Sequence, residues 1–217
     1  GPRNWGDLDA AYSACSEGES QSPINLTGNA KATLDKIRFD YLPSNLDVEN
    51  NGHSIQVNYR SGSYLIVGGK DYELQQFHFH SPSEHKIEGR AYDMELHLVH
   101  KAEDGELAVV ALLMEIGDES PLISTIWEHA PWEAGEREMP TETIDANQFL
   151  PAMSSYFTYY GSLTTPPCTE GVRWFVMQAP VKLSTQQVWD FNALFSESVR
   201  PIQPLNNRIV RQGIYSR

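Results

Sequence analysis

Residues 76–80 read Gln-Phe-His-Phe-His, a strict alternation of polar and aromatic side chains. In a β-strand, successive side chains point to opposite faces, so Gln76, His78 and His80 share one face and the two phenylalanines share the other. The aromatic face predicts a strand packed on a core. The opposite face then presents two imidazoles about 6–7 Å apart along the strand.

Residues 94–100 repeat this pattern and place Glu95, His97 and Val99 on one face. A single histidine is more often an exposed or a hydrogen-bonded core side chain than a metal ligand. If the two strands pair, however, three imidazoles converge. Three neutral histidines would leave a Zn²⁺ ion its full double charge and an open fourth position, a set that favours hydroxide over water.

The rest of the chain reads mostly as short strands separated by turns. Alternation or β-forming residues mark 54–59, 74–80, 94–100 and 172–177, and 107–114 is apolar on both faces, as in a buried central strand. A capping box at residues 184–187 and the pair Ser120-Pro121 predict two helices. With no repeat or linker, residues 1–217 are expected to form a single domain, a large sheet flanked by short helices.

The 217 residues include 29 acidic and 16 basic side chains, a net charge of −13. This balance argues against binding to nucleic acid and to an anionic membrane surface. The longest apolar run, Leu107–Met114, has eight residues, too few for the ~20 of a membrane-spanning helix. Residues 1–9 lack the apolar stretch of a signal peptide, as expected if the chain begins after processing.

The two cysteines, Cys15 and Cys168, lie 153 positions apart, so no CxxC motif is present. They are either two buried free thiols of a cytosolic protein or one disulfide. A disulfide would indicate a periplasmic or extracellular location.

Several motifs in order along the chain together resemble the α-class carbonic anhydrases, in particular bacterial ones. They are Gln-Ser-Pro-Ile-Asn at 21–25, Asn-Gly-His at 51–53, Gln-Phe-His-Phe-His at 76–80, Ser-Glu-His at 83–85, Glu-Leu-His-Leu-Val-His at 95–100, Tyr-Gly-Ser-Leu-Thr-Thr-Pro-Pro at 160–167 and Arg-Pro-Ile-Gln-Pro-Leu-Asn at 200–206. The resemblance spans nearly the whole chain. It implies one domain around a mostly antiparallel, twisted sheet of about ten strands, and a homodimer is expected.

The resemblance implies reversible hydration of CO₂ to bicarbonate and a proton, with Zn²⁺ as cofactor and a small molecule as substrate. His78, His80 and His97 would be the zinc ligands, and zinc-bound hydroxide would be the nucleophile. Thr164 would accept a hydrogen bond from that hydroxide and donate its own to Glu84, which aims a lone pair at CO₂. The same nucleophile predicts a side activity on activated esters.

Other side chains would orient the zinc ligands, carry the product proton or line the substrate pocket. Gln76 and Glu95 would orient the ligands His78 and His97, His85 would support the surroundings of Glu84, and His53 would carry protons to buffer. An ordinary histidine pKa near 6.5 suits proton exchange near neutrality. The residues that would line the CO₂ pocket are Thr165, Val99, Val109, Leu163, Val172 and Trp174.

Two further features are read through the resemblance. The cysteines match a pair that is bridged in many bacterial and extracellular members, which favours a Cys15–Cys168 disulfide and a periplasmic or secreted protein. An aromatic-rich stretch that usually precedes the segment Gly1-Pro2, and that supplies a tyrosine to the active-site water network, is not part of this sequence. The sequon at 25–27 lies in a family core strand and is read as a chance match.

Two other functions share part of this pattern. His78, His80 and Glu84 resemble the metal triad of a cupin-like oxygenase, although Tyr72 stands where the leading glycine of that motif belongs and no second cupin motif follows. The other rival is a carbonic-anhydrase-like binding module without catalysis. Such modules typically lose zinc ligands, whereas all three histidine positions are kept here.

Overall fold

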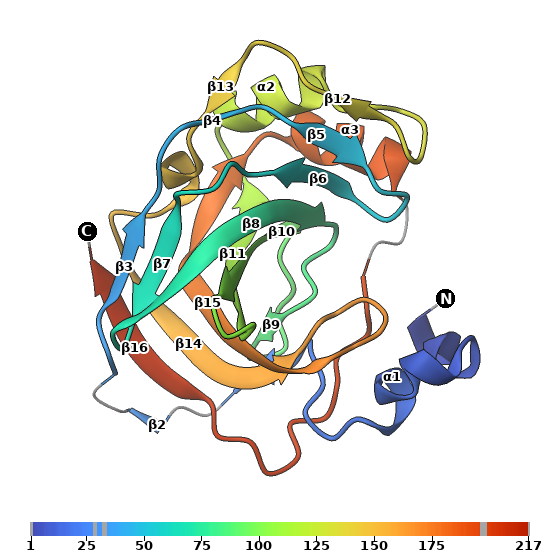
Figure 1. Ribbon diagram of the computed structural model, residues 1–217, viewed down its shortest axis with the longest axis vertical. Helices are drawn as coiled ribbons and strands as arrows, with labels where there is room; N and C mark the ends of the chain where they lie inside the picture. The colour runs from blue at the N-terminus through green and yellow to red at the C-terminus, as the bar shows by residue number, and fades with distance from the viewer. Residues whose placement is uncertain (1, 28–29, 32–33, 196–198, 217) are drawn as a thin grey trace.

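The computed structural model describes residues 2–27, 30–31, 34–195 and 199–216. A curved sheet of 12 strands dominates the molecule, with short helices at its borders (Figure 1). Along its main path the strands lie in the order β12 (Arg137–Glu138), β5 (Val48–Asn50), β6 (Ile55–Asn58), β8 (Lys70–His80), β10 (Met94–Ala102), β11 (Leu107–Ile116), β15 (Glu170–Leu183), β14 (Met153–Ser162), β16 (Arg211–Ser216) and β2 (Ala30–Lys31). β7 (Tyr64–Val67) branches from β8 and pairs with β3 (Ile37–Asp40).

Most neighbouring strands of this sheet are antiparallel, and only β11–β15 and β16–β2 are parallel among the described pairs. Two small sheets accompany it. A parallel one joins β1 (Asn25–Leu26) to β9 (Lys86–Ile87), and an antiparallel one joins β4 (Ser44–Asn45) to β13 (Thr143–Ile144). The expected large, mostly antiparallel sheet of about ten strands is therefore confirmed; the path ends in two strands of only two residues.

Both predicted helices are present. α2 (Pro121–Glu128) begins after its N-cap Ser120, and α3 (Thr185–Leu194) begins with the complete capping box of Ser184 and Gln187. The other helical segments are α1 (Ala14–Glu17) and the 3₁₀ turns η1 (Pro2–Asp7), η2 (Ala10–Tyr12) and η3 (Ala146–Phe149). Among the described residues, no helix combines the length and the apolar character needed to cross a bilayer.

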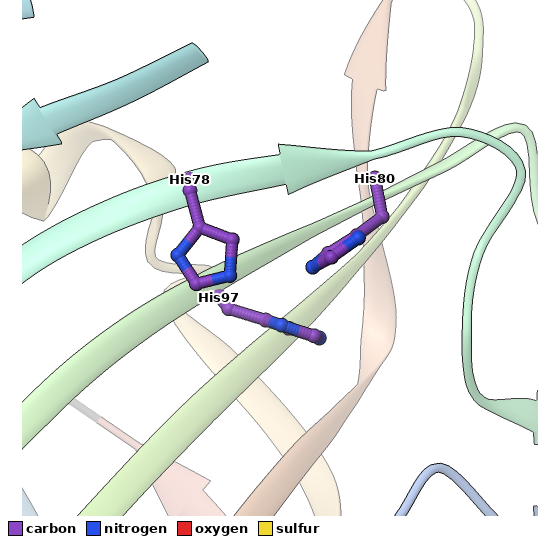
Figure 2. A group of neighbouring side chains, drawn as sticks. All are labelled: His78, His80 and His97. Atoms are coloured by element: carbon purple, nitrogen blue, oxygen red, sulfur yellow. The ribbon is translucent and has the colours of Figure 1, made fainter. Parts of the chain in front are cut away.

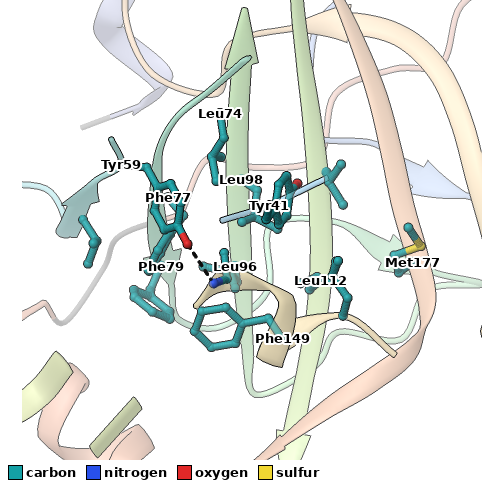
Figure 3. Packing of buried hydrophobic residues seen from close by; sticks show 14 of the residues in the cluster. Tyr41, Tyr59, Leu74, Phe77, Phe79, Leu96, Leu98, Leu112, Phe149 and Met177 are labelled. Carbon is teal, nitrogen blue, oxygen red and sulfur yellow. Dashed lines mark hydrogen bonds between the residues drawn. The ribbon is translucent and has the colours of Figure 1, made fainter. Parts of the chain in front are cut away.

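The alternation in β8 divides its side chains as predicted. Phe77 and Phe79 are fully buried and meet edge to face, with ring centroids 6.0 Å apart. They belong to the larger hydrophobic cluster, shown in Figure 3 around Tyr41, Tyr59, Leu74, Leu96, Leu98, Leu112, Phe149 and Met177. Because this face of β8 is committed to the core, the histidines are left on the other face.

β11 separates this cluster from a second, smaller one. Val110 and Leu112 face the larger cluster, while Val109 and Ala111 face the smaller cluster together with Trp174 of β15. The register places His97 of β10 opposite Ala111, so the smaller cluster lies on the same face of the sheet as the histidines. The apolar run at 107–114 is thus buried on both sides, as its sequence indicates.

His100 of β10 is a core residue rather than a part of the histidine face. Its ring is fully buried and stacks on Tyr41 at 5.8 Å, and the Tyr41 hydroxyl lies 2.7 Å from Nε2. Nδ1 faces the carbonyl oxygen of Ala108 at 3.3 Å, so the neutral ring donates through Nδ1 and accepts through Nε2. Burial lowers the pKa of His100 to about 3, against backbone hydrogen bonds that raise it.

This depressed pKa predicts acid sensitivity. In the unfolded chain, His100 takes up a proton as the pH falls below its ordinary pKa of about 6.5. In the folded chain it stays neutral down to about pH 3, so the free energy of unfolding decreases as the pH falls from about 6.5 to about 3. At pH 4.5 the loss from this residue is expected to be about 3 kcal/mol. Urea unfolding at pH 7 and at pH 4.5 measures this loss. Between the two pH values, His100→Gln should lose about 3 kcal/mol less unfolding free energy than the parent protein does.

The matched control for this comparison is His53→Gln, because the exposed His53 side chain is not buried on folding. It should keep the pH dependence of the parent protein. An equal pH dependence in the parent protein and in His100→Gln would contradict the assignment of acid sensitivity to His100.

Candidate active site

Three histidines converge at the end of β8. His78 and His80 come from β8 and His97 from the neighbouring β10, where it pairs directly with His78. Their rings point toward one another (Figure 2), with centroids 5.1, 5.3 and 4.6 Å apart for the pairs 78–80, 78–97 and 80–97. One nitrogen from each lies within 4.8 Å of the others, which makes the three a group able to hold a metal ion.

Hydrogen bonds fix which nitrogen two of these rings offer. Nδ1 of His78 lies 2.8 Å from Oε1 of Gln76, and Nε2 of His97 lies 2.8 Å from Oε1 of Glu95. An amide oxygen and a carboxylate only accept, so these nitrogens carry the protons. Nε2 of His78 and Nδ1 of His97 are thereby left with lone pairs for a metal, as in the carboxylate–histidine–metal arrangements of known sites.

The protonation states suit a cation. Burial lowers the pKa of His78 well below its ordinary value, with further lowering from His80 and His97, and burial is also the largest cause of the lowered pKa of His97. Burial raises the pKa of Glu95, but His85 and His97 outweigh it and hold that pKa well below the usual range. Imidazoles held neutral at His78 and His97, the second backed by a buried carboxylate, are donors that together with His80 fit Zn²⁺.

A second group of possible ligands, His85, Glu95 and His97, is a hydrogen-bonded network. Nδ1 of His85 lies 2.6 Å from Oε1 of Glu95, Nε2 lies 2.6 Å from the Tyr159 hydroxyl, and the His85 amide donates to Oε2 of Glu95. Both ring nitrogens of His85 are used. The bonds of His85 go to Glu95 and, through it, reach the ring of His97, while its expected support for the surroundings of Glu84 stays a prediction.

Glu84 is buried beside the histidines. Its Oε1 accepts a hydrogen bond of 2.8 Å from the Arg200 amide, and its Oε2 lies 3.6 Å from Nε2 of His80. Oε2 has no hydrogen-bond donor among the described residues. The expected hydrogen bond from Thr164 is therefore not formed to this oxygen in the structure. Thr164 is itself 5% exposed, in the turn that follows β14.

Five of the six residues expected to line a CO₂ pocket lie together. The smaller hydrophobic cluster contains Val109, Val172 and Trp174, with Val99 and Leu163 packed against it. Trp174 also lies against His97, with ring centroids 4.9 Å apart. An apolar wall thus adjoins the histidine group.

Two predicted residues lie at the surface. Thr165 is exposed next to the buried Thr164, and its carbonyl oxygen accepts a hydrogen bond from the Cys168 amide. His53 is exposed in the turn before β6, its amide bonded to the side chain of Asn51. β6 pairs with β8 so that Gln56 faces His78, which places His53 at the end of the sheet where β8 delivers His80.

Cys15 and Cys168 form the predicted disulfide. It joins α1 to the segment that follows Thr164 and Thr165. Arg200 reinforces the same junction by donating to the carbonyl oxygen of Cys15 at 2.8 Å.

Sequence reasoning missed two residues of this region. Tyr159 bonds both His85 and the Ser22 hydroxyl, the latter at 2.8 Å. Arg200 is 3% exposed and joins Glu84 to Ser22, whose carbonyl oxygen accepts from the guanidinium at 2.8 Å. Arg200 begins the motif at residues 200–206, so the sequence did mark it as a candidate. Tyr159 sits among other aromatic residues of β14, and nothing local distinguishes it.

The Glu95 network predicts the effect of a conservative substitution. Glu95→Gln keeps the shape but removes the charge and sets an amide N–H₂ against histidine N–H donors, so zinc affinity should fall about 10–100-fold. Competition with a chromophoric chelator measures this. Glu106→Gln is the control, since Glu106 pairs with Lys70 away from the site. Unchanged affinity in Glu95→Gln would contradict the role given to the network.

Comparisons with known proteins agree with this geometry. The family model for eukaryotic-type carbonic anhydrase matches residues 1–214. A carbonic anhydrase of Nostoc sp. is 43% identical over 220 residues, covering 99% of this chain and 83% of the relative.

Two solved structures are similar over almost their whole length. A hyperthermostable carbonic anhydrase from an active hydrothermal vent chimney has 45% identity and a TM-score of 0.95, with 98% of this chain and 96% of that chain covered. The α-carbonic anhydrase of Thermovibrio ammonificans, solved with the inhibitor sulfanilamide, has 41% identity and a TM-score of 0.95, with 97% and 95% covered.

The cupin-like alternative does not hold. The metal-binding group contains His97 and not Glu84, and the family match extends over nearly the whole chain. The chain belongs to the eukaryotic-type carbonic anhydrase family, of the α class.

Proposed function

We propose that His78, His80 and His97 bind Zn²⁺ and that this centre carries out the family reaction, the reversible hydration of CO₂ to bicarbonate and a proton. The observation that carries the proposal is the convergence of three buried or partly buried histidines, two of which have their lone pairs turned inward by Gln76 and Glu95. When bound, the zinc ion supplies a Lewis acid that makes water a nucleophile near neutral pH.

The apolar wall would hold the substrate. CO₂ is small and uncharged, so Val109, Val172 and Trp174 can surround it without polar contacts, and Val99, Leu163 and Thr165 would complete the pocket. The net charge of −13 on the protein does not repel a neutral gas. A dry apolar surface also keeps bulk water from competing for the position of the substrate.

Glu84 and Thr164 would orient the attacking oxygen. Within the described parts of the chain, Oε2 of Glu84 is a buried acceptor without a donor, and such an atom destabilises the fold unless a hydroxyl bonds it. The Thr164 hydroxyl can donate to Glu84 and then accept only from the attacking oxygen. Because the Thr164 hydroxyl donates its proton to Glu84, it can only accept the proton of the attacking oxygen. This fixes the direction in which the lone pair of that oxygen points.

His53 would pass the product proton to buffer. It is exposed at the end of the sheet that carries His80, and an imidazole exchanges protons readily near neutral pH. His53→Ala should therefore slow the reaction most in weak buffer and recover in concentrated imidazole buffer.

Removal of the metal tests the function. Stopped-flow measurement of CO₂ hydration should show activity that is lost with a strong zinc chelator and restored by added Zn²⁺. Because the T. ammonificans relative binds sulfanilamide, the same inhibitor is expected to act here. Well-folded protein that contains zinc but lacks activity would favour the non-catalytic binding module instead.

The location is proposed from the disulfide. A Cys15–Cys168 bond persists in oxidising compartments, which supports a periplasmic or secreted protein formed as one domain over residues 1–217. The homodimer expected from the resemblance stays a prediction.

A further inference from the structure

A groove of 460 Å³ lies between α2 and α3, at the end of the molecule where Figure 1 shows both helices beside β12. Trp127 and Phe191 line it and stack on each other with centroids 5.8 Å apart. Nε1 of Trp127 donates to the carbonyl oxygen of Gln187 at 2.9 Å, so the one polar atom of this indole is satisfied within the protein. The floor of the groove is therefore aromatic and apolar.

The groove lies on the opposite face of β8 from the histidines. Trp127 packs edge to face on Phe79, with centroids 4.7 Å apart, and Phe79 points away from the face that carries His78 and His80. The groove is thus separate from the candidate active site.

Trp132 lines the groove from the segment after α2, and 73% of its surface is exposed. Most large aromatic side chains of this protein are buried, and an indole left open beside a groove offers a ready contact surface. Its face is also the preferred aromatic partner of an organic cation.

Three carboxylates line the same groove, Glu119, Glu128 and Asp190, and no lysine, arginine or histidine does. None of the three forms an ion pair within the described parts of the chain. The carboxylates lie on both sides of the groove, Glu119 and Glu128 with α2 and Asp190 on α3. Oε1 of Glu119 is held by the Ser124 hydroxyl at 2.5 Å.

We propose that this groove binds a linear organic dication, a molecule with an apolar body and a positive charge near each end. The body would lie on Trp127 and Phe191, one cationic end would meet the face of Trp132, and the carboxylates on the two sides of the groove would neutralise the charges. A metal ion fits less well, because these carboxylates do not come together as a group of ligands. An anionic or purely apolar partner would leave all three negative charges unpaired.

Hexamethonium is a suitable probe. Its quaternary ammonium groups have no N–H, so it reports on aromatic and charge contacts alone, and 1,6-hexanediol is a neutral control of similar length. Isothermal titration at low salt should show saturable one-to-one binding of hexamethonium, and none of the diol. Salt should weaken the binding because the contacts are partly ionic.

Matched variants locate the binding. Trp132→Ala and Glu128→Gln should each weaken hexamethonium binding about tenfold, while thermal stability and CO₂ hydration stay as in the parent protein. Trp189→Ala is the control, since Trp189 is 66% exposed on α3 but does not line the groove. It should bind as the parent does.

Three results would overturn the proposal. They are the absence of saturable binding, equal binding by parent and Trp132→Ala, and an equal loss in Trp189→Ala. Dimerisation that Trp132→Ala abolishes, without hexamethonium binding in the parent, would instead assign the groove to a second copy of the chain.

Discussion

Replacing His97 by alanine is expected to remove bound zinc and to lower CO₂ hydration by at least about a thousandfold, since the metal provides most of the rate acceleration. His97 is 1% exposed, pairs with His78 across β8 and β10, and is the ligand that Glu95 holds in place. Its loss leaves two imidazoles on one strand and takes from Oε1 of Glu95 one of its two ring donors, the other being His85. Metal content by elemental analysis and stopped-flow kinetics measure the two effects.

His129→Ala is the control for this substitution. His129 follows α2, where its nitrogens lie 3.7 and 3.5 Å from the carboxylates of Glu138 and Glu142, away from the candidate site. The control variant should keep zinc and activity, and circular dichroism should show that both variants fold. Full activity in folded His97→Ala protein would refute the ligand assignment.

Removing the disulfide is expected to have the second largest effect, this time on stability. Cys15→Ser with Cys168→Ser opens a loop with a sequence separation of 153 residues, which should lower the free energy of unfolding by about 2–5 kcal/mol. For a chain of this size the Tm should fall by on the order of 10 °C. Chemical and thermal unfolding of the double variant measure both quantities.

Parent protein kept in reductant is the control, and it should match the double variant. Hydrogen bonds to the backbone carbonyl oxygens of Cys15 and Cys168 come from Arg200 and Gln21 and do not need the sulfur atoms, so the native fold should persist. If the double variant loses less than about 1 kcal/mol of unfolding free energy, the disulfide does not stabilise the fold by restricting the conformations of the unfolded chain.

Local sequence patterns predicted the framework of the site. In β8, alternation alone determines that Phe77 and Phe79 enter the core and that His78 and His80 share the other face. The capping box of α3 and the doubly apolar β11 are likewise local or periodic features, and both are present. Such features follow from the periodicity of a single strand or helix, so a short stretch of sequence is enough to predict them.

Contacts across the fold were harder to predict. His85 precedes β10 by several residues, and its bond to Glu95 depends on how the loop after β8 returns to the sheet. The sequence places His85 beside Glu84, but only the fold shows that its ring bonds Glu95, because adjacent side chains need not share a partner. Tyr159 reaches His85 only because β14 and β15 curve around the same cluster, a consequence of tertiary packing.

An anomalous difference map recorded at the zinc absorption edge would test the central claim most directly. The account predicts a single strong peak enclosed by Nε2 of His78, a ring nitrogen of His80 and Nδ1 of His97, and no peak among His85, Glu95 and Tyr159, whose polar atoms already bond one another. A peak at another place, or no peak in protein that hydrates CO₂ at full rate, would contradict it.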